Sequence, residues 1–381
     1  MQHHILVGTH QKTGTVWMHD VFRNIAKAID TEYYNVSLQN TKSFGKQFKY
    51  IIGRPDKKVI IFDNHSAFPD QCFALDHRGI RLIRDPRDMA ISAARYHQTT
   101  KAKFANKPRA DLGGKSLRAH ISALPSFEEK LLFEIDYAIK NNIDDMYKYR
   151  FDGEHLKPVK YESLIDDSGL DVVPSVIAYL GLTDEEAVIA LCIFWERSLF
   201  GLKSRESSTH IRSGHSRQYK DKYTAAVHEA FERNFPGIVA DLAYDDPPAL
   251  NPDIRAVAVP DVLHVVREAL VAERGTVGVD RALERAVPHL DRPGALYAGY
   301  ARYLLGNGEA ARAEDYAWRA LELDETAPEA SIVLGDVRTA RDDRRGAERA
   351  YLTALTLAPE SAVAARRLAA TAEPPALTEA L

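Results

Sequence analysis

Residues Ile5 to Asp20, ILVGTHQKTGTVWMHD, place one lysine and several hydroxyl side chains between an apolar run and a helical pattern. Loops of this composition bind phosphate, because backbone N–H groups at a helix N-terminus and a nearby cation face the same point. Lys12 supplies the charge, while Thr13, Gly14 and Thr15 supply hydroxyl and backbone donors. In nucleotide-triphosphate loops the lysine instead follows the second glycine. The loop predicts an anion site without magnesium; the alternative is a plain strand–turn–helix connection.

A second candidate for phosphate binding is the segment IRDPRDMAIS, residues 83–92. An apolar strand delivers Arg84 into a turn at Pro86, and a helix is expected from about Asp88, with Ser92 one turn further on. An arginine and a serine placed in this way grip one phosphate from two sides, the arginine bidentately. The alternative is that Arg84 pairs with Asp88 and that Ser92 is ordinary helix surface.

A third basic stretch, His210 to His215, contains Arg212, Ser213 and Gly214. Taken alone, it is most simply solvated loop charge. The stretch from Tyr96 to Gly114 is rich in Lys, Gln, Thr, Gly and Asn, and we interpret it as a mobile loop over the substrate side, with an inert surface loop as the alternative.

The elements that must position these residues alternate between strands and helices. Short apolar strands are expected at residues 5–7, 59–62, 80–84 and 158–161, and helices at 16–28, 89–97 and 127–149. This alternation predicts an α/β fold, with a parallel sheet flanked by helices. In such sheets the ligand lies at the carboxyl ends of the strands.

The C-terminal part of the chain differs in composition. Acids and prolines at residues 245–252 indicate a linker, after which Ala, Arg, Leu and Glu dominate. Two segment pairs recur at an offset of 34 residues, Ala313-Glu314 with Ala347-Glu348 and Ala320–Leu323 with Ala354–Leu357, and a weaker copy begins at Ala282. This is the period of the tetratricopeptide repeat. We predict a first domain over 1–246, a linker over 247–260 and an all-α repeat-like domain over 261–381; an unrelated array of helical hairpins is the alternative.

The bulk composition excludes several classes of protein. The chain has 381 residues and a net charge of −4, so no global field favours nucleic acid or an anionic membrane. Two cysteines, Cys72 and Cys192, cannot build a disulfide framework or a four-ligand zinc site, and no metal site is expected. No signal peptide or membrane-spanning run is evident. The expectation is a soluble, cytoplasmic protein.

Together, the three basic segments resemble those of sulfotransferases that use 3′-phosphoadenosine 5′-phosphosulfate (PAPS). The stretch HQKTGTVW, residues 10–17, is similar to the family's phosphosulfate loop, Pro-Lys-Ser-Gly-Thr-Thr-Trp. Arg84 and Ser92 match its 3′-phosphate site, including their separation. Arg212-Ser213-Gly214 is similar to its late Arg-Lys-Gly loop. The resemblance spans roughly residues 5–243 and leaves out the repeat-like tail.

The resemblance also implies roles for individual residues. It places Lys12 to Trp17, Val16 included, on the donor's phosphosulfate and Trp17 on adenine, with Tyr161 of the stretch KYESL nearby. His65, after the second strand, matches the family's general base, and a histidine titrates near neutral pH. Two family lysines are replaced, one by Asp63 and the other by Ser213. The carboxylate of Asp63 is then free to orient His65 or to pair with Lys12.

The resemblance implies an enzyme that moves a sulfuryl group from PAPS to an acceptor hydroxyl, with His65 and Lys12 as catalytic residues and the desulfated bisphosphate PAP as product. The acceptor class stays open among carbohydrates, lipids, phenols and other small-molecule alcohols. The tail is a candidate for protein binding or self-association. Two alternatives remain, namely an ATP-dependent kinase of the same general fold and a catalytically idle scaffold.

Overall fold

The computed structural model describes residues 3–36, 48, 58–148, 154–201, 215–244, 250–273 and 275–372. The chain divides into two compact units, each built from separated segments. The first unit comprises Met1–His19, Tyr34–Leu180 and Glu206–Val257, and the second comprises Asp20–Tyr33, Gly181–Arg205 and Ala258–Leu381. The predicted assignment of residues 1–246 and 261–381 to two functional domains stays a prediction, and residues 247–249 of the predicted linker lie outside the described residues.

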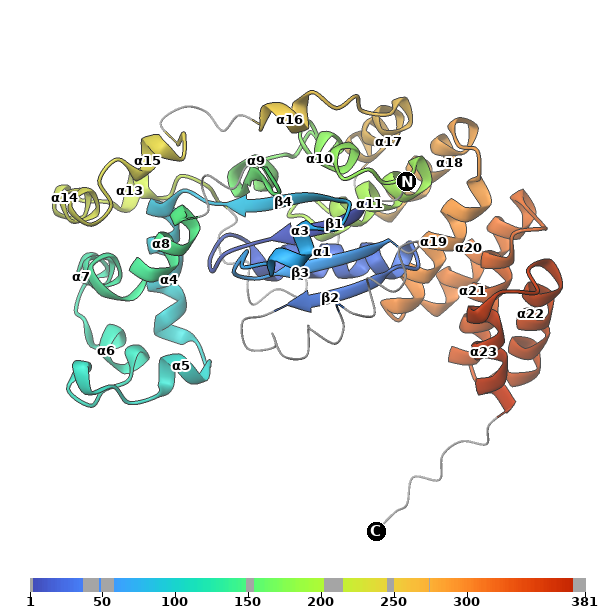
Figure 1. The fold of residues 1–381 in the computed structure, drawn as a ribbon, viewed down its shortest axis with the longest axis horizontal. Coiled ribbons are helices and arrows are strands. Elements are labelled where there is room, and N and C mark those ends of the chain that lie inside the picture. Colours follow the sequence, from blue (N-terminus) through green and yellow to red (C-terminus); the bar gives the residue numbers. More distant parts are fainter. Residues whose placement is uncertain are drawn as a thin grey trace, which may run out of the picture. The chain divides into compact units, whose positions relative to one another are not determined.

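The chain forms a five-stranded sheet with the strand order β2-β3-β1-β4-β5, of which Figure 1 labels β1 to β4. The strands are β1 His4–Gly8, β2 Glu32–Val36, β3 Val59–Asp63, β4 His77–Ile83 and β5 Lys157–Lys160. Strands β3, β1, β4 and β5 pair in parallel. Every residue of β1 and β3 is buried, as expected for continuous apolar strands covered by helices on both faces. The predicted α/β fold is confirmed.

Strand β2 was not evident in the sequence. Its residues, EYYNV, are mostly half-buried, and it lies at one end of the strand order. An edge strand carries polar side chains and lacks the continuous apolar run that identified the central strands.

The helices comprise α1 Thr15–Ala28, α3 Asp70–Phe73, α4 Pro86–Thr99, α5 Lys103–Asn106, η2 Ala110–Leu112, α6 Leu117–Ala123, α7 Phe127–Phe133, the π-helix η3 Glu134–Ala138, α8 Lys140–Lys148, α9 Tyr161–Ile165, α10 Val173–Tyr179, α11 Asp184–Arg197, α13 Tyr219–Lys222, α14 Ala225–Asn234, α15 Ile238–Asp241 and α16 Pro252–Arg255. They continue with α17 Asp261–Ala272, α18 Thr276–Ala286, η5 Val287–His289, α19 Pro293–Gly306, α20 Ala310–Leu323, α21 Pro328–Ala340, α22 Arg344–Leu357 and α23 Ala362–Ala372.

Two expectations about helix α4 and its surroundings need correction. The helix begins at Pro86 rather than near Asp88, because Asp85 caps it by accepting the Arg87 backbone N–H and proline occupies the first turn. The stretch from Tyr96 to Gly114 is not simply a loop. Helix α4 extends to Thr99, and α5 and η2 follow within the same stretch.

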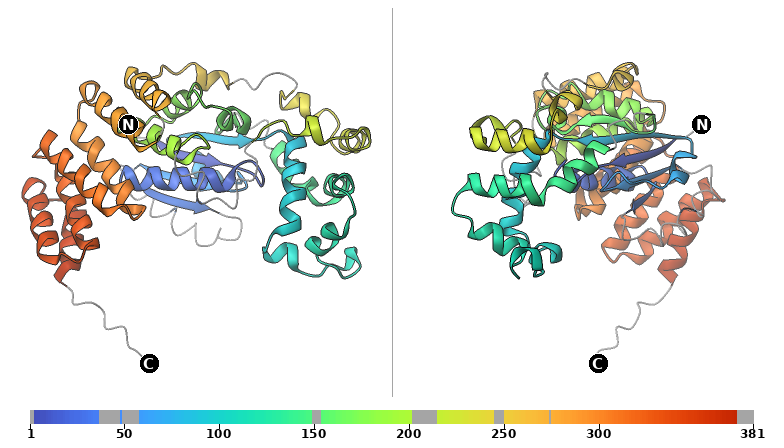
Figure 2. Two further views of the ribbon diagram at one scale, coloured as in Figure 1. Left: turned by 180° about the vertical axis from the view of Figure 1, so that it is seen from behind. Right: turned by 60° about the vertical axis from the view of Figure 1, so that its left-hand side comes forward.

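The C-terminal helices pack as successive antiparallel pairs, α19 with α20 and α21 with α22 (Figure 2). The recurring alanines Ala313, Ala320, Ala347 and Ala354 are all fully buried, which allows neighbouring helices to approach closely. The ring of Tyr351 fills the space beside Gly335. The predicted all-helical tail is confirmed, whereas its identity as tetratricopeptide repeats stays a prediction. No helix among the described residues is both long and apolar enough to span a membrane.

The second unit also contains α11 and most of α1. The Arg197 guanidinium forms an ion pair of 2.7 Å with Asp20 of α1 and hydrogen-bonds the side chain of Asn307, which follows α19. Gly299 of α19 allows close packing, since a Cβ there would lie 2.4 Å from Ile189 Cδ1 and 3.1 Å from the Ala28 carbonyl oxygen. Helices α1, α11 and α19 therefore share one packed core.

We expect Gly299→Leu to lower the free energy of unfolding by about 1–3 kcal/mol or more, because the backbone of α1 cannot yield space to the new side chain. Gly306→Leu is a matched control in the same helix, where a Cβ would meet only the Lys27 side chain at 3.5 Å, and it should stay within about 0.5 kcal/mol of the parent. Urea unfolding measures both. Equal stability of the two variants would contradict the shared core.

Candidate functional site

The loop after β1 is closed by hydrogen bonds to one residue, His10. The hydroxyls of Thr13 and Thr15 both donate to its carbonyl oxygen, at 2.8 and 2.7 Å, and its N–H donates to the Thr13 hydroxyl. The two hydroxyls predicted to bind phosphate thus shape the loop in this structure. Helix α1 begins at Thr15, so its first backbone N–H groups, which lack intrahelical partners, face this loop.

Two residues of the loop have left-handed backbone conformations, Lys12 with φ 70° and Gly14 with φ 97°. At Gly14 a side chain would also collide with Tyr161, since a Cβ would lie 2.8 Å from its ring. Glycine is therefore required there on both conformational and steric grounds.

The Lys12 ammonium lies 3.9 Å from the centre of the Tyr96 ring, a cation–π contact with α4. It also interacts electrostatically with the buried Glu134. The pKa of Glu134 is raised overall, because the effect of burial exceeds the opposing effects of the nearby His97 and Lys12. Sequence reasoning missed Tyr96 as a contact of the loop. Its spacing of four residues from Ser92 could have indicated it, because residues i and i+4 share a helix face.

Arg84 follows β4 and is only 7% exposed. Its Nη1 donates to the Lys12 carbonyl oxygen at 2.9 Å, and its guanidinium carbon lies 4.6 Å from the centre of the Tyr161 ring. Its Nε has no hydrogen-bond partner among the described residues. The alternative pairing partner, Asp88, instead accepts the Tyr219 backbone N–H at 3.0 Å. Ser92, half-buried, lies in the second turn of α4 on the face shared by Asp88 and Tyr96.

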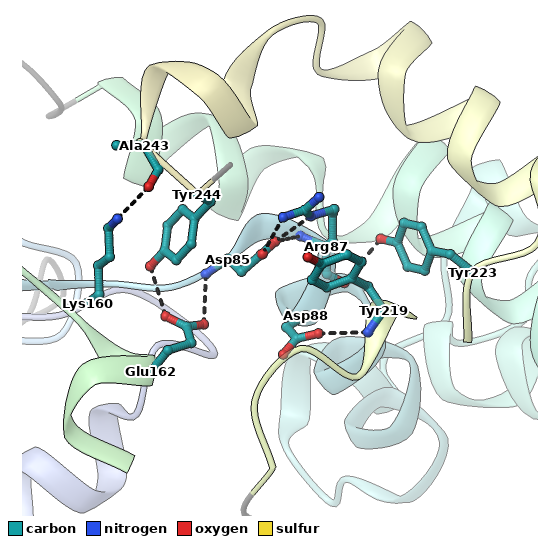
Figure 3. Close-up of polar contacts among 9 residues, drawn as sticks. All are labelled: Asp85, Arg87, Asp88, Lys160, Glu162, Tyr219, Tyr223, Ala243 and Tyr244. Carbon is teal, nitrogen blue, oxygen red and sulfur yellow. Dashed lines mark hydrogen bonds and ion pairs between the residues drawn. The ribbon is translucent and has the colours of Figure 1, made fainter. Parts of the chain in front are cut away.

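The buried carboxylate of Glu162 joins α9 to the segment that begins with Asp85 (Figure 3). Glu162 accepts the Asp85 backbone N–H at 3.0 Å and the Tyr244 hydroxyl at 2.9 Å. Burial raises the pKa of Glu162 to about 7, against the opposing effect of the Arg84 charge. Glu162 thereby fixes the start of α9 against the residue that follows Arg84.

A second set of contacts ties α13 to the start of α4 (Figure 3). The Arg87 guanidinium donates to Asp85 at 2.9 and 2.7 Å and lies 3.7 Å from the centre of the Tyr219 ring. The Tyr223 hydroxyl donates to the Arg87 carbonyl oxygen at 3.1 Å. The predicted site residues Arg212, Ser213 and Gly214 lie outside the described residues.

His65 lies in the turn after β3, the strand that pairs with β1 on the side opposite to β4. Its backbone N–H donates to the Asp63 carboxylate at 2.7 Å, and the Thr9 N–H donates to the Asp63 carbonyl oxygen at 2.9 Å. Asp63 is fully buried, and burial raises its pKa. Its carboxylate thus holds the backbone of the His65 turn, while the Lys12 ammonium lies at Tyr96.

The histidine in the β1 loop is electrostatically linked to that turn. Burial, together with the charges of Arg81 and His65, lowers the pKa of His10 to about 3. His10 is therefore neutral near pH 7 and contributes its backbone rather than a charge.

The structure brings most of the predicted residues to the carboxyl edge of β3, β1 and β4. Trp17 and Tyr161 form an edge-to-face pair with ring centres 6.2 Å apart. Val16, by contrast, is 57% exposed. The functional roles of all these residues stay predictions.

Comparisons with known proteins bear on this arrangement. The family model described as "Sulfotransferase domain" matches residues 2–241. Among solved structures, one match is the mouse sulfotransferase SULT7A1 complexed with PAP, with 16% sequence identity and a TM-score of 0.42 over 63% of this chain and 84% of the mouse chain. No curated protein matched the sequence.

We expect stability to depend on pH through Glu162. Its raised pKa means that Glu162 binds a proton more tightly in the folded protein than in the unfolded chain. This tighter proton binding stabilises the fold fully below about pH 4, and the stabilisation is lost as pH rises through about 7. Between pH 5 and 8 the free energy of unfolding of the parent should fall by roughly 2–3 kcal/mol more than that of Glu162→Gln. Urea unfolding of both proteins at each pH measures the difference, and parallel pH profiles would exclude the effect.

Proposed function

The chain belongs to the sulfotransferase domain family, and on that premise we propose that it transfers a sulfuryl group from PAPS to an acceptor hydroxyl. The buried Arg84 guanidinium carries the proposal. It lies between the Lys12 carbonyl and the Tyr161 ring, and its buried Nε–H donates a hydrogen bond to none of the described residues. Such a donor suits a phosphate oxygen, which accepts charge-assisted hydrogen bonds from arginine.

The remaining contacts fit the two ends of the donor. The N-terminus of α1 and the backbone around Gly14 suit the phosphosulfate, because both present N–H groups and a positive partial charge. The edge-to-face pair of Trp17 and Tyr161 offers aromatic surface for a purine. Arg84, with Ser92 on the adjoining helix, holds the 3′-phosphate, and Arg212, Ser213 and Gly214 complete that site.

In the proposed reaction a bond forms between the acceptor oxygen and sulfur while the bond from sulfur to the bridging phosphate oxygen breaks. His65 takes the proton of the acceptor hydroxyl as general base. Lys12 moves from the Tyr96 ring to the departing phosphate and neutralises its charge. Catalysis is mainly positioning and charge stabilisation, by analogy with phosphoryl transfer.

The tail, residues 261–381, is proposed to act as an interaction domain, in a protein that works in the cytoplasm. Supporting this, Trp318 and Leu352 are 45% and 48% exposed at equivalent positions of α20 and α22, 34 residues apart. Exposed apolar side chains repeated in this way suit contact with a carrier protein or a second copy of the chain.

We expect His65→Asn to lower turnover by roughly 10²–10⁴-fold while PAP affinity stays within about threefold of the parent, because only proton removal is lost. Turnover is measured as release of PAP from PAPS with a panel of sugar, phenol and lipid hydroxyl acceptors. The exposed histidine of α17 provides a control, His264→Asn, which should retain full activity. Unchanged turnover in His65→Asn would rule out this residue as the base.

A further inference from the structure

Helices α5 and α6 and the turn between them carry a concentrated positive charge. Between Lys101 and Arg118 the chain has six lysines and arginines and one acid, Asp111, although the whole protein carries a net charge of −4. We call Lys101, Lys103, Lys107, Lys115 and Arg118 the basic face; all five are exposed.

Backbone and side-chain contacts hold the second half of this segment against α5. The Arg109 N–H donates to the Lys115 carbonyl oxygen at 3.1 Å, and Pro108 pairs with Ser116 in an antiparallel bridge. The Arg118 guanidinium reaches Asn106 of α5 at 3.4 Å. Helix α5 and the start of α6 are therefore held next to each other.

The nearby acids do not neutralise this face. Asp111 pairs with Arg109 at 3.0 Å and accepts the Tyr137 hydroxyl. In α7, Glu129 caps its own helix through Ser126, and Glu128 accepts the Thr224 hydroxyl. Among the described residues, no acid forms an ion pair with any of the five cations of the basic face.

A chain of ring contacts connects the basic face to the proposed catalytic lysine. The Lys12 ammonium contacts the Tyr96 ring, whose centre lies 5.5 Å from that of His97. The His97 ring in turn lies 5.8 Å from Phe104, which is 51% exposed between Lys103 and Lys107. The Glu134 carboxylate fixes His97 in this position, with 2.6 Å between Oε1 and Nδ1. The face is therefore linked to the Lys12 ammonium through three successive ring contacts.

We propose that the basic face binds an acidic polysaccharide, which is the acceptor of the sulfuryl group. This inference rests on the function proposed above and names its substrate class. Exposed lysines form adaptable contacts with repeated carboxylates, and the ring of Phe104 offers an apolar surface for a sugar ring. A glycan also presents several hydroxyls on each residue, and the proposed transfer needs a hydroxyl.

Two other polyanionic partners fit less well. A protein interface is usually enriched in arginine and aromatic residues and depleted of lysine, whereas four of the five cations here are lysines. Sites for single-stranded nucleic acid add several aromatic side chains on which successive bases stack, whereas Phe104 is the one aromatic residue between Lys101 and Arg118.

The test measures binding of oligogalacturonate to the full chain, beside the same oligosaccharide with its carboxylates methyl-esterified. The charged form should bind and weaken as salt rises, and the esterified form should bind at least roughly tenfold less tightly. Replacing Lys101, Lys103, Lys107 and Lys115 together with glutamine should weaken binding of the charged form by roughly tenfold or more, while PAP affinity is unchanged. Replacing Arg344, Arg345, Arg349 and Arg366 with glutamine removes the same charge from exposed positions of the tail and should change neither.

Several results would overturn the inference. Equal binding of the charged and esterified oligosaccharides, or unaltered binding by the lysine variant, would contradict the role of the basic face. If PAP still binds in those experiments, the proposed donor is unaffected. Tighter binding of single-stranded DNA or of polyglutamate would assign the face to a nucleic acid or an acidic protein. If the protein binds oligogalacturonate but not PAP, the result would instead contradict the proposal that PAPS is the donor. The role of the face as an acceptor site would then fail with it.

Discussion

The hydrogen bond from the Arg84 guanidinium to the Lys12 carbonyl joins the end of β4 to the loop after β1. Lys12 has a left-handed backbone that few lysines adopt, so its conformation depends on what surrounds it. Arg84 fixes its carbonyl, and the Tyr96 ring holds its ammonium. Because Arg84 is itself buried against Tyr161, the β1 loop, α4 and α9 take their positions around one cation.

Three buried carboxylates hold the backbone segments around this site in place. Glu162 links the start of α9 to the residue after Arg84, Asp88 holds the start of α13, and Asp63 holds the turn that carries His65. Burial raises the pKa of all three. Each accepts backbone N–H groups, which offsets part of the cost of burying a carboxylate. The segments that carry the predicted functional residues thus have backbones fixed by hydrogen bonds to buried acids.

The central strands and the position of Arg84 could be predicted from the sequence, for physical reasons that differ from element to element. Strands β1, β3 and β4 are recognisable because strands buried on both faces are apolar throughout, and Arg84 follows directly from where β4 ends. Strand β2 was missed because its residues, EYYNV, are mostly half-buried and include no continuous aliphatic run. The contacts of Glu162 could not be predicted, because they join segments far apart in the chain and depend on how α9 leaves the sheet, whereas the helical spacing of Tyr96 from Ser92 could have indicated that Tyr96 faces the loop. Asp63 was expected to act on a side chain, and the structure shows that it accepts a backbone N–H.

The central claim is that this site takes an adenosine bisphosphate rather than a nucleoside triphosphate. Thermal unfolding with increasing PAP, beside ATP with magnesium, tests it most directly. PAP at about 100 times its dissociation constant should add roughly 2.7 kcal/mol of stability, and Arg84→Gln should shift the titration to higher PAP concentrations. Stabilisation by ATP with magnesium but not by PAP would contradict the account and favour a kinase. Stabilisation by neither, at concentrations that would reveal weak binding, would leave a scaffold without a donor site.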